Sequence, residues 1–152
     1  MCVVTRMNGG FSRARCLTGT VVVLLSCTAC SSSELASQAD NAFQRLTESV
    51  PWSLSEPPGK PGGCSLVVDV EMCGALILRV RATDDVVLAG LPDVVRRIGF
   101  SHHVRTEGCS DCPQKPTVIG ADAAGHELAI TVYPELDTGG AMLDAYLVAP
   151  RP

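Results

Sequence analysis

The sequence predicts an α+β domain in which helices cover one face of a small antiparallel sheet. Three observations support this fold class. A stripe of apolar residues with helical spacing comes early, a second such stripe follows a pair of strand-like runs, and the last third of the chain alternates apolar and polar residues between turns. The element order is therefore helix, two strands, helix and a run of strands, which is typical of α+β domains.

The first helix is expected at residues 31–50. Its apolar residues recur every three or four positions, so they share one face that we expect to pack on the sheet. They are Leu35, Ala39, Ala42, Phe43, Leu46 and Val50. Residues 51–63 are rich in Pro and Gly and form a loop. Trp52 is expected to pin this loop to the core.

Two strands are expected next, at residues 66–70 and 75–81. A tight turn at Cys73-Gly74 would join them as a hairpin. Charged side chains of the two strands would then face each other across the hairpin. These are Asp69 and Glu71 on the first strand, and Arg79 and Arg81 on the second. We interpret them as a solvated surface of alternating charge.

The second helix is expected at residues 91–98. Thr83 or Asp84 begins this segment, but Pro92 interrupts a continuous helix, so a short turn should precede the helix. Gly99 is the expected C-cap. The rest of the chain is predicted to form β structure, with strands at 102–106, 116–120, 127–133 and 142–148 and turns at 122–125 and 137–140.

The beginning of the chain has the three parts of a secretory signal. A basic segment comes first, an uncharged apolar stretch follows at residues 17–25, and a small residue then precedes Cys27. The apolar stretch is shorter than the roughly 20 residues that a membrane-spanning helix needs. Residues 1–26 are therefore expected to be a signal peptide, whose translation starts at Met1 or Met7.

The four residues Leu24-Leu25-Ser26-Cys27 resemble the lipobox of bacterial lipoproteins, in which Leu stands three residues before the cysteine and a small residue one before. The resemblance covers residues 1–33 only. It implies that Cys27 carries a diacylglyceryl group, which anchors the chain to the extracytoplasmic face of the cell membrane. Residues 27–33 would be the lipidated cysteine and a Ser-rich tether, followed by a single domain at residues 34–152.

Cys30 is the alternative lipidation site, because Ala29 before it is also small. Lipidation of Cys27 leaves five cysteines behind it, an odd number for an oxidising compartment. Lipidation of Cys30 removes Cys27 with the signal and leaves four. The lipobox pattern nevertheless favours Cys27.

The charge of the chain argues against a nucleic-acid partner. The net charge is −4, and removal of residues 1–26, which contain three arginines and no acid, lowers it to −7. The remaining basic residues are scattered along the sequence. An acidic domain of this kind repels phosphate backbones and anionic lipid headgroups. The membrane connection must therefore come from the lipid.

Cys109-Ser110-Asp111-Cys112 is a C-x-x-C motif, which serves disulfide exchange, metal binding or structural pairing. A redox pair needs a thiolate stabilised at a helix N-terminus, whereas the prolines that follow this motif indicate a loop. Zinc needs four ligands, and the sequence lacks a second C-x-x-C. The residues that could complete a zinc set are His102, His103, Cys64 and Cys73.

Paired cysteines of exported proteins usually oxidise, so we expect two structural disulfides. The favoured connectivity is Cys64–Cys73 with Cys109–Cys112, because local loops close at the least entropic cost. A straight strand would hold Cys64 and Cys73 roughly 30 Å apart. A disulfide holds its two Cα atoms within about 7 Å. The chain between Cys64 and Cys73 must therefore bend.

The sequence contains no nucleophile motif, P-loop or dinucleotide-binding motif. Asp84-Asp85 is explained by a helix N-terminus, which favours acids, and His126-Glu127 lies beside a turn. We therefore expect no catalytic residues, no bound metal and no cofactor.

These observations together favour a non-enzymatic, lipid-anchored domain that binds an envelope protein or a small ligand. The alternative function is that of a thiol-redox or metal-binding protein that uses Cys109 and Cys112.

Overall fold

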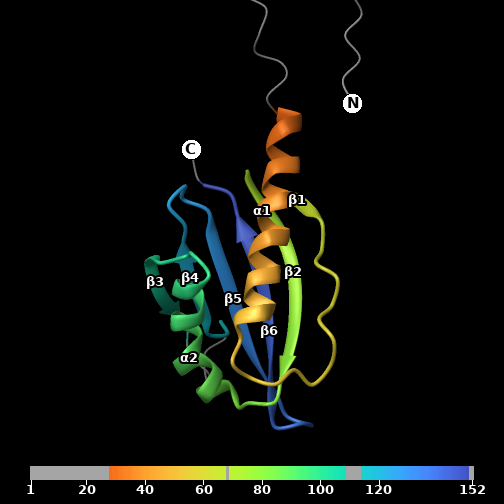
Figure 1. The fold of residues 1–152 in the computed structure, drawn as a ribbon, viewed down its shortest axis with the longest axis vertical. Coiled ribbons are helices and arrows are strands. Elements are labelled where there is room, and N and C mark those ends of the chain that lie inside the picture. The colour runs from red at the N-terminus through yellow and green to blue at the C-terminus, as the bar shows by residue number, and fades with distance from the viewer. Residues whose placement is uncertain (1–27, 68, 109–113, 151–152) are drawn as a thin grey trace, which may run out of the picture.

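The structure, a computed structural model, describes residues 28–67, 69–108 and 114–150, which form a helical layer packed on one sheet (Figure 1). Within these residues the sheet has six strands in the order β1-β2-β6-β5-β4-β3, and all neighbouring strands are antiparallel. The strands are β1 (Cys64–Val67), β2 (Val70–Val80), β3 (His102–Glu107), β4 (Thr117–Ala121), β5 (Glu127–Glu135) and β6 (Gly140–Val148). The helices are α1 (Thr28–Ser49) and α2 (Asp84–Arg97). The predicted α+β class is confirmed.

Helix α1 packs its predicted apolar stripe against β2 and β6. The buried residues of this stripe are Leu35, Ala39, Ala42, Phe43 and Leu46. Val50, just after the helix, is partly buried against the same core. The helix begins at Thr28, so its first turns include residues of the predicted tether.

Helix α2 runs without a break through Pro92, so the predicted interruption at that residue is wrong. Proline inside a helix removes one backbone hydrogen bond and costs about 3 kcal/mol. The residues that offset this cost are buried at helical spacing: Val87, Leu91, Val94 and Val95. Because tertiary packing supplies most helical stability in proteins, this apolar face holds the helix together across the proline.

The predicted helix end at Gly99 is confirmed, with Ile98 as the C-cap residue and Gly99 directly after it. Gly99 has φ +107°, a conformation that favours glycine. Its N–H donates to the carbonyl of Arg96 at 3.2 Å, and the N–H of Phe100 donates to the carbonyl of Val95 at 3.1 Å. These two bonds form a Schellman motif. The motif turns Phe100 back into the core, where it is buried.

The first hairpin turns earlier than predicted. β1 pairs with β2 so that Cys64 lies opposite Cys73 and Val67 opposite Val70. The turn therefore lies between Val67 and Val70, and the predicted turn at Cys73-Gly74 is wrong. Asp69 has φ +63°, which Asp tolerates better than most residues. The apolar run around it hid this turn signal.

The Pro- and Gly-rich loop runs along the outer edge of β2. Ser55 donates its N–H to Arg79 at 2.8 Å, Arg81 donates to Ser53 at 2.8 Å, and Gly62 donates to Ala75 at 3.3 Å. Prolines lack a backbone donor. This segment therefore covers the edge of β2 without creating a new strand edge to which other chains could pair. Trp52 packs against the core, close to Gly90 of α2, as predicted.

Candidate functional site

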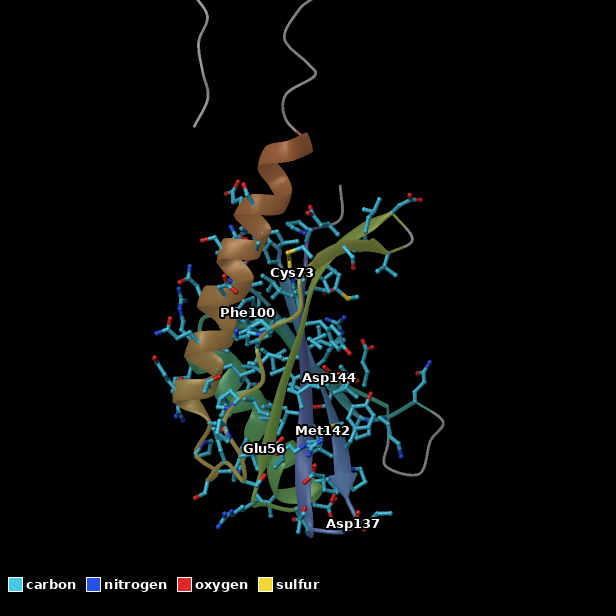
Figure 2. The ribbon with its side chains drawn as sticks, turned by 90° about the vertical axis from the view of Figure 1, so that its right-hand side faces the viewer. Glu56, Cys73, Phe100, Asp137, Met142 and Asp144 are labelled. Carbon is cyan, nitrogen blue, oxygen red and sulfur yellow. A yellow bond between two sulfur atoms is a disulfide. The ribbon has the colours of Figure 1, made fainter. Side chains whose placement is uncertain are left out.

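The helices cover one face of the sheet and leave the other uncovered by any helix of the described residues (Figure 2). On this uncovered face the strand register places Tyr133 opposite Met142, Thr131 opposite Asp144, and Ala129 opposite Tyr146. All six of these side chains are partly exposed. The uncovered face therefore offers aromatic, polar and acidic groups side by side on β5 and β6.

Tyr146 and Asp144 form the main polar contact of the uncovered face. The Tyr146 hydroxyl donates a hydrogen bond to Oδ2 of Asp144. The tyrosine ring lies over Gly74 of β2, where a Cβ atom would come within 2.5 Å of its Cδ1 atom. The hydrogen bond to Asp144, followed by partial burial and by the charges of Asp144 and Tyr133, raises the pKa of Tyr146 to about 12.

This pKa predicts a distinct titration step. The pKa of Tyr146 rises from 10.0 in the unfolded chain to about 12 in the fold. The folded protein thus holds the proton more tightly, so the stabilisation is fully present below the unfolded pKa and is lost as the pH rises through the folded value. The tyrosinate absorbance should show a step near pH 12 that Tyr146→Phe removes and Tyr133→Phe retains. A step that persists in Tyr146→Phe would contradict this assignment.

Arg79 lies beside this contact and pairs with acids other than those predicted. Its Nε atom is 3.0 Å from Oε1 of Glu135 on β5 and 3.3 Å from Oε1 of Glu56 in the loop. The predicted pairing of Arg79 and Arg81 with Asp69 and Glu71 is wrong, because the chain turns before Val70 and Glu71 therefore lies on β2 itself. The ion pairs of Arg79 tie the loop to the sheet.

His126 and Asp122 form a pair that the sequence reading missed. His126 Nδ1 lies 3.0 Å from Asp122 Oδ2, and the backbone N–H groups of Ala124 and His126 each donate to Asp122 Oδ1 at 2.9 Å. Asp122 therefore shapes the turn between β4 and β5. Glu127, which follows His126 in the sequence, forms an ion pair with Arg105, in which Oε1 of Glu127 lies 3.5 Å from Nη2 of Arg105. The sequence signal that could have indicated this pair is the spacing of Asp122 and His126, which stand four residues apart across a turn.

Two hollows flank α1. One, of about 280 Å³, is lined mainly by apolar groups of α1, the loop and β2, including Phe43, Pro58 and Leu76. The other, of about 170 Å³, is lined by a mixture of polar and apolar groups that includes Gln38, Arg45 and Asp122. Arg45 already donates from Nη1 to the carbonyl of Ile98 at 3.3 Å, which joins α1 to the end of α2. Arg45 and Asp122 thus have structural roles.

The predicted pair Cys64–Cys73 forms a disulfide between β1 and β2. Their Cα atoms are 4.0 Å apart, since the hairpin turn brings the two residues directly opposite each other. The expected bend between these cysteines is thus the hairpin turn between Val67 and Val70. Cys109 and Cys112 lie outside the described residues.

The histidines that could complete a zinc site lie on the edge strand β3. His102 and His103 are both exposed, and Cys64 and Cys73 are joined to each other. Across residues 28–67, 69–108 and 114–150, no three His, Cys, Asp or Glu side chains gather as metal ligands do. A zinc set formed with Cys109 and Cys112 stays a prediction.

The predicted lipidation site adjoins the folded domain. Cys27 lies outside the described residues, and Cys30 falls in the first turn of α1. Neither α1 nor α2, as far as they are described, combines the length and hydrophobicity of a membrane-crossing helix. Comparison of the chain with protein-family models, curated proteins and solved structures found no match.

Proposed function

We propose that this chain is an exported bacterial lipoprotein, anchored through Cys27 to the extracytoplasmic face of the cell membrane. The observation that carries the proposal is the signal-like segment that ends in Leu24-Leu25-Ser26-Cys27. Helix α1 begins at the next residue, Thr28. The domain would therefore stand directly against the membrane, without a long linker between the lipid and the fold.

The Cys64–Cys73 disulfide supports an extracytoplasmic location. Structural disulfides persist in oxidising compartments and are rare in the cytosol. Cys73 is 1% exposed, so the bond is shielded on that side by the core. The disulfide closes the hairpin at the point where β1 leaves the core.

The proposal gives the domain a non-enzymatic role, in which it binds an envelope protein or a small ligand. We assign binding to the uncovered face of the sheet. Tyr, Met and Arg are enriched in protein interfaces, and Tyr133, Tyr146, Met142 and Arg79 lie together on β2, β5 and β6. No cofactor is part of this role.

Cell fractionation tests the anchor. In a bacterial host that processes lipoproteins, Cys27→Ala should move the protein out of the membrane fraction or leave it as an unprocessed precursor, because the thiol that receives the lipid is gone. Cys30→Ala is the matched control and should stay membrane-bound. The intact mass of the membrane-extracted protein should show a diacylglyceryl group on its first residue. The reverse pattern for the two variants would place the lipid on Cys30.

The alternative function, thiol-redox or metal chemistry at Cys109 and Cys112, is favoured only by the C-x-x-C spacing. Peptide mapping of the unreduced domain, exported by its host, distinguishes the two functions. We expect the pairs Cys64–Cys73 and Cys109–Cys112, both oxidised, because local loops close most readily. Free thiols or bound zinc at Cys109 and Cys112 would instead support the alternative.

A further inference from the structure

β1 is attached to the sheet by one disulfide and a short run of backbone pairs. Cys64 is partly buried against the core, whereas Ser65, Leu66 and Val67 are exposed. Leu66 is 71% exposed and Val67 is 45% exposed, although both side chains are apolar. Beyond Cys64, burial of side chains therefore contributes little to holding β1 in place.

The Cys64–Cys73 disulfide joins this exposed strand to the core at the base of the hairpin (Figure 2). Cys73 is 1% exposed and belongs to the core, and Cys64 lies directly opposite it. A two-stranded hairpin without a packed face is marginally stable by itself. We therefore expect the disulfide to supply much of the stability with which β1 pairs to β2.

β1 covers the part of the β2 edge that the Pro- and Gly-rich loop does not bond. The loop bonds to backbone groups of residues 75–81. Ala149 donates its N–H to the carbonyl of Glu71 at 2.9 Å, so the backbone of Glu71 faces away from β1. Backbone groups of successive strand residues alternate in direction, so those of Val70 and Met72 face β1. Loss of β1 would expose these donors and acceptors at the edge of the sheet.

We propose that the Cys64–Cys73 disulfide is a redox latch. While it is oxidised, β1 covers the edge of β2, and its reduction by a dithiol releases β1 and opens the edge at Val70 and Met72. An open edge of this kind accepts an extended segment of another chain by strand addition. The latch requires only the hairpin, so it does not depend on the proposed lipid anchor.

The latch opens by thiol–disulfide exchange. Cys64 is the more accessible partner, because it is only partly buried whereas Cys73 is almost fully buried. A thiolate of the dithiol attacks Sγ of Cys64, the bond between the two cysteines breaks, and Cys73 leaves as a thiolate that takes up a proton. The second thiol of the dithiol then attacks the mixed disulfide and releases Cys64 as a thiol. The dithiol is oxidised to its own disulfide, and the two cysteines gain two electrons and two protons.

Hydrogen–deuterium exchange of the full chain, purified from its bacterial host, tests the latch. Exchange is followed by mass spectrometry with and without dithiothreitol, and alkylation confirms the reduction of Cys64 and Cys73. We call the backbone amides of residues 65–67 and 70–72 the hairpin amides. Those that are protected should exchange on the order of 100-fold faster after reduction, because a disulfide that closes a loop of this length stabilises by about that factor. Exchange in β5 and β6 should not change.

Two variants separate this disulfide from the other cysteines. Cys64→Ala cannot form the bond, so its hairpin amides should exchange rapidly with or without dithiothreitol. Cys109→Ala combined with Cys112→Ala is the matched control, because it removes two cysteines and keeps the latch. Its hairpin amides should exchange slowly until dithiothreitol is added, as in the wild-type chain.

Three outcomes would overturn the latch. Slow exchange of the hairpin amides after complete reduction would show that backbone pairs alone hold β1 on the sheet. Faster exchange in β5 and β6 as well would show that the disulfide stabilises the whole domain rather than one strand. A disulfide that dithiothreitol reduces only after the domain is unfolded in denaturant would show that Cys64 is closed to thiols in the fold.

Discussion

Replacing Phe43 with alanine is expected to lower the free energy of unfolding by about 3 kcal/mol, because the loss of a buried aromatic ring removes its transfer energy and leaves a cavity. Phe43 is 2% exposed and belongs to the core that joins α1 to the sheet. α1 contacts β2 and β6 through this face, so the cavity would lie between the two layers. Chemical denaturation of the domain, followed by circular dichroism, measures the change.

The matched control for Phe43→Ala is Ser37→Ala, at an exposed position of the same helix. It should change the free energy of unfolding by no more than about half a kcal/mol. A value of that size for Phe43→Ala would mean that α1 does not pack on the sheet in solution. The helix would then be a solvated tether between the lipid and the remaining domain.

The sequence predicted the elements whose apolar pattern is regular. The stripe from Leu35 to Leu46 repeats at the helical period, so both the helix and its buried face followed from it. The last strands alternate apolar and polar residues, so the uncovered face of the sheet also follows from their period of two. Gly99 predicted the end of α2, because the residue with a left-handed backbone conformation that follows a helix is most often glycine.

The wrong predictions arose where tertiary packing overrode a local sequence preference. Pro92 normally interrupts a helix, but the buried face of α2 outweighs this local preference. The hairpin turn contains Asp69 rather than glycine, inside an apolar run, so its position was hidden. Because the turn comes earlier than predicted, Glu71 lies on β2. Arg79 pairs instead with Glu56 and Glu135, which are distant in sequence.

The candidate site was less accessible to sequence reasoning than the fold. The contact between Tyr146 and Asp144 needs two residues on the same face of β6, which the period of two allows but does not single out. The ring of Tyr146 also needs Gly74 beneath it, on a strand more than 70 positions earlier in the chain. Pairing of β2 with β6 brings these residues together, and such long-range strand pairing is not encoded in any local pattern.

Replacing Gly120 with alanine is expected to lower the free energy of unfolding by about 3 kcal/mol, the upper part of the range for overpacked cores. β4 passes directly beneath the end of α2 at this residue. A Cβ atom on Gly120 would lie 2.4 Å from the carbonyl oxygen of Phe100 and 2.5 Å from Cγ1 of Val95. The N–H of Phe100 and the carbonyl of Val95 form one bond of the Schellman motif, so neither residue can move without weakening the cap.

Gly63→Ala is the control for this substitution, because a Cβ atom on Gly63 would have nothing within 4 Å. It should leave the free energy of unfolding within about half a kcal/mol of the wild-type value. Gly120→Ala should therefore unfold at a clearly lower denaturant concentration than Gly63→Ala, although each variant adds only one methyl group. Equal midpoints for the two variants would show that α2 does not press on β4. The cap at Gly99 would then fix the end of the helix without fixing its position on the sheet.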